Sequence, residues 1–248
     1  AIEAGLVKPV PDELGIESLT SENLKEFVLV FNKEVNKDTI STDNIKVKKS
    51  GATVAGYTVS LKDDKRTVVI KAASGQGFEN QTKYSVTVKN VKDSEGNKIK
   101  ETTVDIEPFD SKLPEVNAVK VTGPKSLEIE FSEPIKKAGT PSVTLKTGTT
   151  TIGVNSATIG GYESNKISVD LYSTMSDGKT YTVSIKGFED FAGYKMINYT
   201  TDIEYVTDKS EITAEIEKAE QTYVVIKFNK PVTFGTSPKE YFYHTFSA

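Results

Sequence analysis

The sequence predicts an all-β protein made of tandem immunoglobulin-like Greek-key β-sandwich domains. Apolar and polar residues alternate with a period of two along most of the chain, as in residues 127–131 (LEIEF), so each run has one buried and one solvated face. Turn signals such as Ser50-Gly51 and Asp177-Gly178 separate these runs. The pattern repeats after just under 100 residues, and about seven short strands in that length are typical of such a sandwich.

Two repeated blocks define the period. An apolar strand that ends in Phe and continues into a short polar segment occurs at residues 27–35, 127–135 and 224–232, and its Phe moves by 100 and then by 97 positions. A second block joins a Tyr-led strand to an Asp and a Gly, at residues 84–96 and 181–193, and all three residues shift by 97. The second block does not occur a third time, so we expect the chain to be a section of a longer array.

These blocks predict a linker at 1–12, a first sandwich at 13–108, a second at 109–207 and an incomplete third module at 208–248. Two prolines bracket the first join, which should make it semi-rigid. Single helical turns are the most that we expect at 21–24 and 38–40. The expected strands lie near 14–18, 26–32, 44–48, 53–61, 66–72, 83–91 and 98–106, then near 116–122, 126–132, 142–146, 150–158, 166–171, 180–186 and 195–204, and finally near 212–217 and 223–229.

The composition excludes several classes of function. The chain has no cysteine, which removes disulfides, thiol catalysis and thiolate metal sites. Its net charge is −4 and Arg66 is its only arginine, so it lacks the arginine forks that recognise phosphates and bases, and we expect no nucleic-acid partner. No apolar run approaches the roughly 20 residues that cross a bilayer, so we expect no membrane insertion. His244, the only histidine, lies in the incomplete module, and we expect no enzyme activity.

The repeated blocks also resemble a known family. Phe-Asn-Lys-Glu-Val at 31–35, Phe-Ser-Glu-Pro-Ile at 131–135 and Phe-Asn-Lys-Pro-Val at 228–232 resemble the immunoglobulin-like repeats of Bacillaceae surface-layer (S-layer) proteins. The Tyr-led strand that continues into Asp-x-x-Gly, at 84–99 and 181–196, carries the same resemblance.

This resemblance implies a structural protein outside the cell, at the bacterial surface. Proteins of this kind assemble with copies of themselves into a two-dimensional lattice, in which the repeats form the body and adjacent modules of one chain contact each other. A separate region, which this sequence does not show, attaches to wall polysaccharide. Calcium often stabilises such layers and is the candidate cofactor, while no cofactor is expected to be required.

Two alternative functions stay open at this point. The chain could be an adhesin segment or a carbohydrate-binding module, for which exposed aromatic residues would serve as platforms. It could also be an immunoglobulin-like spacer of a larger secreted enzyme whose catalytic domain is encoded elsewhere. The candidate aromatic residues are Tyr57, Tyr162, Phe188, Phe191 and Tyr194.

Five acidic residues are the candidate calcium ligands. Asp93 and Glu95 lie in the turn of the first Tyr-led block, and Asp190 lies in the turn of the second. Asp110 and Glu115 lie in the linker and could join the Asp93 turn in a site between modules. Clustered carboxylates suit Ca²⁺ because it prefers oxygen ligands. The competing interpretation is structural, since Asp accepts backbone N–H bonds in turns and Gly adopts positive φ there.

Val28 and Val30 are candidate assembly contacts. If Phe27, Leu29 and Phe31 point into the core, these two valines point outward, where the second module has Glu128 and Glu130. Exposed apolar residues on a strand can mark a contact between modules or subunits. A lightly covered sheet face is the alternative.

Overall fold

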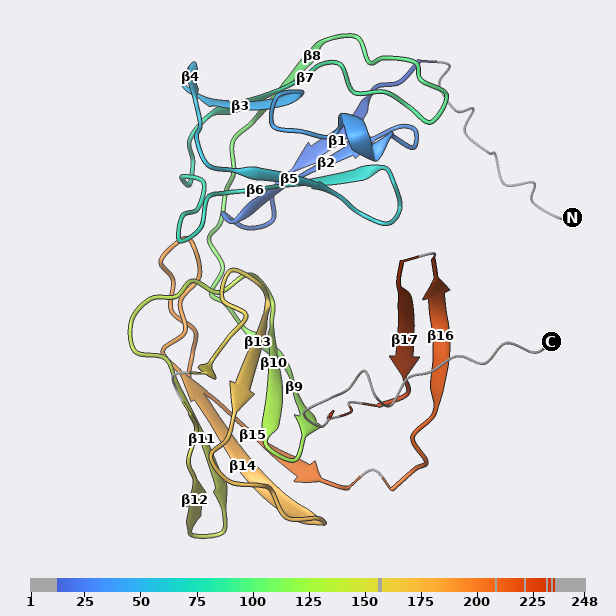
Figure 1. The fold of residues 1–248 in the computed structure, drawn as a ribbon. Coiled ribbons are helices and arrows are strands. Elements are labelled where there is room, and N and C mark those ends of the chain that lie inside the picture. The colour runs from blue at the N-terminus through green and yellow to red at the C-terminus, as the bar shows by residue number, and fades with distance from the viewer. Residues whose placement is uncertain are drawn as a thin grey trace, which may run out of the picture.

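The computed structural model describes residues 13–155, 158–207, 209–220, 222–230, 232 and 234. Two β-sandwiches follow one another along the chain, and a two-stranded hairpin follows the second (Figure 1). All strand pairs within the sandwiches are antiparallel, so the predicted all-β fold class is confirmed. Within the described residues, no helix has the length and apolar character that a membrane span requires.

The first sandwich packs two four-stranded sheets face to face. A single short 3-10 helix, η1 (Lys37–Thr39), follows β2, close to the helical turn expected at 38–40. The first sheet has the order β1 (Ile16–Thr20), β2 (Glu26–Phe31), β6 (Thr67–Lys71), β5 (Thr58–Leu61), and the second has the order β4 (Ala52–Thr53), β3 (Ile45–Lys49), β7 (Tyr84–Val88), β8 (Thr102–Ile106).

The second sandwich repeats this plan with one strand fewer in its first sheet. Its strands continue the numbering, and the two sheets again face each other across a core. The three-stranded sheet has the order β13 (Lys166–Asp170), β10 (Ser126–Phe131), β9 (Val116–Gly123), and the four-stranded sheet has the order β12 (Thr150–Ile152), β11 (Ser142–Thr147), β14 (Lys179–Lys186), β15 (Tyr199–Tyr205).

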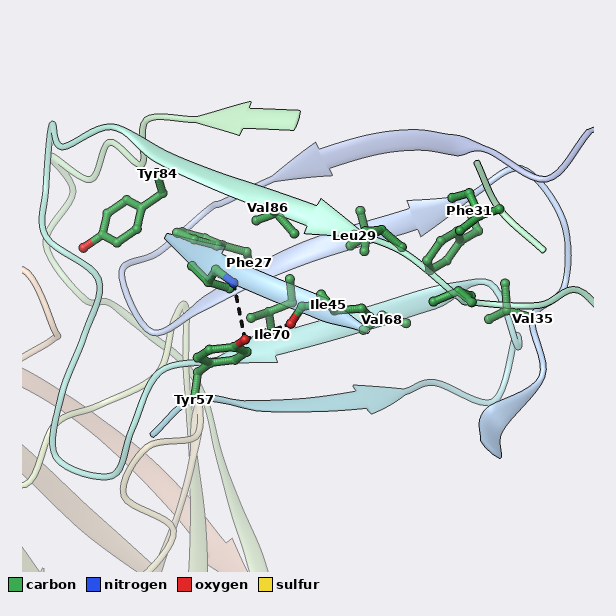
Figure 2. Packing of buried hydrophobic residues seen from close by; sticks show 14 of the residues in the cluster. Phe27, Leu29, Phe31, Val35, Ile45, Tyr57, Val68, Ile70, Tyr84 and Val86 are labelled. Carbon is green, nitrogen blue, oxygen red and sulfur yellow. Dashed lines mark hydrogen bonds between the residues drawn. The ribbon is translucent and has the colours of Figure 1, made fainter. Parts of the chain in front are cut away.

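Strict alternation along the strands builds each core. In β2 the side chains of Phe27, Leu29 and Phe31 are fully buried, and Figure 2 shows them pointing into the space between the sheets. Tyr57 closes one edge of this core, and its hydroxyl donates a 2.8 Å hydrogen bond to the carbonyl oxygen of Ile45 (Figure 2). The buried residues of the two cores fall within 14–99 and 127–196, so each core lies inside one predicted module. The module boundaries themselves stay a prediction.

Some local expectations differ from the structure. Residues 21–24 form a bend rather than a helical turn, because Asn23 Oδ1 accepts the backbone N–H groups of Lys25 and Glu26 at 2.8 and 3.2 Å. The strand expected at 98–106 starts only at Thr102, since Lys98 is used in an isolated bridge with Lys92 that closes the preceding turn.

The third repeat contributes one antiparallel hairpin, β16 (Ala214–Ala219) and β17 (Val224–Phe228), as the two strand predictions for this region indicated. Several of its apolar side chains are exposed, including Ile216 at 69% and Val224 at 53%, while Ile226 and Phe228 are half-buried. The aromatic stretch 241–246 lies outside the described residues.

Val28 and Val30 lie on the outer face of β2, as expected, and both are half-buried. Val28 is level with Thr20 and Val69 on the neighbouring strands, and Val30 is level with Thr67. Their neighbours on the sheet cover them in part, and their role as assembly contacts stays a prediction.

Candidate metal centre

Three carboxylates converge where the second sandwich meets the linker that leads into it. Asp110, Glu133 and Asp190 each place an oxygen within 4.8 Å of the other two. Their exposed fractions are only 4%, 9% and 0%. Three acidic groups packed so closely away from water repel one another, so either a bound proton or a cation has to reduce their combined charge.

The linker holds Asp110 by its backbone. The side chain of Asn80 forms two hydrogen bonds with that backbone: its Nδ2 donates to the Asp110 carbonyl oxygen at 2.6 Å, and its Oδ1 accepts the Asp110 N–H at 2.9 Å. The N–H of Lys112 donates to Asp110 Oδ1 at 3.1 Å. The other carboxylate oxygen, Oδ2, is buried and has no hydrogen-bond partner.

Glu133 lies in the loop that follows β10. Its neighbour Ser132 is tied to the linker in both directions, because its N–H donates to the Glu115 carbonyl oxygen at 2.8 Å and its Oγ accepts the Glu115 N–H at 3.0 Å. The linker and the loop therefore run side by side, which brings Glu133 to Asp110 although they are well separated in sequence.

Asp190 lies in the tight turn that follows β14. Its N–H donates to the Tyr194 carbonyl oxygen at 3.0 Å, and its Oδ1 accepts the Tyr194 N–H at 2.8 Å. Gly193 has φ +88°, a conformation that favours glycine. The repeated Asp and Gly are thus needed for the turn, while only one oxygen of Asp190 is used in it.

The electrostatics of the cluster disfavour three simultaneous negative charges. Asp110 Oδ2 and Asp190 Oδ2 are buried and have no hydrogen-bond partner, which is costly for charged oxygens. Burial, together with the charges of Asp110 and Asp190, raises the pKa of Glu133 to about 8. Burial also raises the pKa of Asp190 to about 6, against the opposing effect of the backbone N–H groups in its turn.

The donor set fits a hard divalent cation such as Ca²⁺. Calcium takes about six to eight oxygen ligands and accepts irregular geometry, and this cluster offers three carboxylates. The burial of all three side chains argues against the paired-carboxylate chemistry of glycoside hydrolysis, which needs a cleft that a sugar chain can enter. The arrangement is suited to holding an ion and joining three segments.

The structure groups the five predicted calcium ligands differently from the expectation. Asp110 does join a turn, but it is the Asp190 turn of the second module, and the prediction that it joins the Asp93 turn is wrong. Glu115 contributes its backbone rather than a carboxylate. Asp93 and Glu95 stay in the turn of the first module, where Asn97 satisfies both oxygens of Asp93.

The sequence interpretation missed Glu133. The signal that could have found it is the repeat itself: the position two residues after the motif Phe is Lys33 in the first block and Lys230 in the third, but an acid in the second. A carboxylate that replaces a lysine next to a buried aspartate is a local change of charge that has to be compensated.

Of the five candidate sugar-binding aromatics, two are buried, two are half-buried and one is exposed. Tyr57 and Phe188 are 8% and 1% exposed and belong to the two cores, so they are not platforms. Tyr162 packs against the second core. Phe191 is half-buried below the ammonium group of Lys25 in the first module, 4.5 Å from it. Of the five, Tyr194 is the most exposed, at 37%.

Comparison with known proteins gives the following findings. The family pattern described as "Bacterial Ig-like domain" matches residues 9–110 and again 108–207. The "Outer cell wall protein" of Brevibacillus brevis is 31% identical over 248 residues, which cover 96% of this chain and 22% of that protein. The "Surface-layer 125 kDa protein" of Lysinibacillus sphaericus is 27% identical over 227 residues, which cover 89% of this chain and 18% of that protein. The chain therefore spans about a fifth of the length of these relatives.

Among solved structures, the S-layer protein SbsC is similar over 84% of this chain and 28% of its own, with 14% identity and a TM-score of 0.48. The N-terminal part of SbsC covers 79% of this chain with a TM-score of 0.41.

Proposed function

Because the chain belongs to the family of bacterial Ig-like domains, we propose that it is a structural section of a bacterial surface layer. Two of its relatives are named as an outer cell wall protein and a surface-layer protein, and tandem sandwiches are suited to act as stiff, repeating units. In this proposal the protein lies outside the cell and its modules contact copies of the same protein. Wall polysaccharide is bound by other regions, and no catalytic step is involved.

The proposed role of the acidic cluster is to hold Ca²⁺ and thereby fix the linker against the second module. One observation carries this part of the proposal: two carboxylate oxygens, on Asp110 and Asp190, are buried without a hydrogen-bond partner. A cation there would join the linker, the loop after β10 and the turn after β14. It would also remove the repulsion that raises the pKa of Glu133.

The metal proposal is tested by calorimetric titration of the chelator-treated chain with Ca²⁺. We expect one saturable site, and Glu133→Gln should weaken it at least tenfold. The matched control is Glu95→Gln, which changes an exposed acid in the corresponding turn of the first module. Equal binding by the native chain and by Glu133→Gln would contradict the assignment of this cluster.

The assembly proposal is tested separately, by light scattering and electron microscopy as a function of protein concentration. Open, non-closing contacts between identical subunits allow growth in two dimensions, so the longer protein that contains this section should form sheets. A longer protein that stays monomeric at all concentrations, with and without Ca²⁺, would count against a lattice role while leaving the metal site untouched.

A further inference from the structure

A fully buried lysine lies at the edge of the first module that faces the second. Lys25 is 0% exposed, and its Nζ donates to the carbonyl oxygens of Ala73 and Gln76, both at 2.9 Å. A buried ammonium group is costly unless it is paired with a negative charge. Among the described residues, no carboxylate of the first module lies within ion-pair distance of it. The charge that it meets belongs to the second module.

That charge is Glu163, in the turn before β13. Its Oε2 lies 3.3 Å from Lys25 Nζ, and its Oε1 accepts hydrogen bonds from the Ser74 hydroxyl, at 2.9 Å, and from the Gly75 N–H. Burial alone would raise the pKa of Glu163, but these donors and Lys25 hold it below its ordinary value. Both carboxylate oxygens are thus bound by the neighbouring module.

The backbone around Glu163 is shaped for this contact. Glu163 has φ +70°, an uncommon conformation for a residue with a side chain. On the other side of Lys25, the Phe191 ring lies 4.5 Å from the ammonium group and close to Gly77, where an added Cβ would meet Phe191 Cβ at 3.1 Å. A side chain at position 77 would crowd the approach of the second module.

We propose that Lys25, Ser74 and the Gly75 N–H form a carboxylate-binding socket on the first module, whose specific partner is the Glu163-bearing turn of an adjoining module. The socket recognises a carboxylate on a turn together with an aromatic residue that covers the lysine. It therefore determines which module can dock behind the first one, and it does so without a metal ion.

The second module has no equivalent socket, which supports a specific rather than a generic contact. Backbone hydrogen bonds pair Ala72 with Lys25 and Leu171 with Lys125, so Lys125 is the structural counterpart of Lys25. Lys125 is exposed. Residues 72–78, which include the two carbonyl groups that bind Lys25, correspond to the shorter segment 171–175. The N–H groups of Phe78 and Met175 form equivalent backbone hydrogen bonds at the ends of these segments. The shorter segment has no counterpart of Ser74, Gly75 and Gln76.

This asymmetry has a mechanical consequence. The junction between the first and second modules is held by an ion pair between the fully buried Lys25 and the partly exposed Glu163. By contrast, the ion pair of Lys209, after β15, with Asp177 lies on the surface, with side chains 80% and 45% exposed. Exposed pairs contribute little. The first two modules should therefore move as one body.

The experiment uses the whole chain with spin labels at Lys48→Cys and Lys146→Cys, exposed positions on β3 and β11 of a chain without cysteine. Pulsed electron resonance should give one narrow distance distribution. Glu163→Gln and Lys25→Met should each broaden it at least twofold, in chelator, while the matched control Lys125→Met leaves it unchanged. Circular dichroism melting checks that each variant is folded.

The outcomes separate this proposal from the metal proposal. An unchanged narrow distribution for folded Glu163→Gln in chelator would overturn the socket. Broadening by Glu163→Gln with no effect of Ca²⁺ on any sample would support the socket and contradict a cation at the junction. If Lys25→Met does not fold, Glu163→Gln decides, because it changes only a charge on a half-exposed turn.

Discussion

The turns around Asp93 and Asp190 have the same backbone and opposite electrostatics. In each turn, the carbonyl oxygen of the residue before the aspartate accepts a backbone N–H from the loop after the motif strand: Lys92 from Asn36 and Glu189 from Lys136, both at 2.8 Å. Each turn closes on a glycine of positive φ. In the first module, however, Asn97 Nδ2 donates to the second oxygen of Asp93 at 3.0 Å, while in the second module the same oxygen of Asp190 is buried without a partner.

Two substitutions account for this difference. Tyr194 stands where the first module has Asn97, so the side-chain amide that would satisfy Asp190 is missing. Glu133 stands where the first module has Lys33, whose charge helps to lower the pKa of Asp93 after the hydrogen bonds from Asn97. The turn of the first module therefore satisfies both oxygens of Asp93, while the turn of the second leaves one oxygen of Asp190 without a partner.

The linkers show the same contrast. Asn80 Oδ1 accepts the N–H of Asp110, and Asp177 Oδ1 accepts the N–H of Thr207 at 2.6 Å, so Thr207 occupies the place of Asp110 after the second module. With Lys230 in the place of Glu133, that junction lacks two of the three acids. Within the described residues, a linker, a loop and a turn each contribute a carboxylate to one cluster only at the junction before the second module.

The largest expected effect comes from Glu133→Lys, which gives the second module the charge pattern of the first. The new ammonium group would neutralise Asp110 and Asp190 in place of the ion. We expect calcium binding to be lost and the chelator-treated chain to melt at a higher temperature than the native chain in chelator. Calorimetry and thermal denaturation measure both. A variant that binds calcium as tightly as the native chain would contradict the role given to Glu133 in the difference between the two turns.

The next effect is the pH dependence in chelator. The folded pKa values of Glu133 and Asp190, about 8 and about 6, lie above the ordinary values of 4.5 and 3.8, so the folded state holds more protons than the unfolded state between about pH 4 and 8. Stability should therefore fall as pH rises through this window, with a slope of up to about 1.4 kcal/mol per pH unit for each proton.

Urea denaturation at a series of pH values in this window checks that slope. Lys112 is the nearby cation that opposes the shift of Glu133. Saturating Ca²⁺ should flatten the dependence, and Glu133→Gln should reduce it without any metal. A stability that rises steadily from pH 4 to 8 in chelator would contradict the raised pKa values.

A smaller effect is expected from Asn97→Ala, which removes the amide from the first turn. Asp93 Oδ2 would lose its partner, at a cost of about 1–3 kcal/mol for a buried acceptor. Because Lys33 stays nearby, no calcium site should appear. Denaturation measures the loss of stability of this variant, and calcium titration measures its binding. A gain of calcium binding would show that the amide alone accounts for the difference between the two turns.

The smallest effect on stability should follow from changing Val28 and Val30 to Thr. The corresponding Glu128 and Glu130 of the second module pair on the surface with Lys166 and Lys120, at 3.4 and 2.9 Å. The outer face of this strand thus tolerates polar residues, and we expect a stability loss of about 1 kcal/mol or less. If the valines are assembly contacts, the longer protein should assemble more slowly; unchanged assembly would contradict that role.

Local sequence patterns specify most of the strands, the two cores and the repeated turns. These features depend on local patterns: alternation places Phe27, Leu29 and Phe31 on one face whatever follows, and Asp and Gly specify a turn through their own side chain and backbone. The prediction that Asp93 and Asp190 are turn residues needs no distant partner. For the same reason, repetition of the pattern was sufficient to predict repetition of the fold.

Which charged residues come into contact depends on the packing of the folded chain. Asp110, Glu133 and Asp190 come from a linker, a loop and a turn, and Lys25 meets Glu163 across two modules. No periodicity relates these positions. Their convergence depends on the path of the linker beside Ser132 and on how the sandwiches dock. The three carboxylates therefore form a buried cluster only in the folded chain. Charge acts through space, and its partners are set by packing rather than by spacing along the chain.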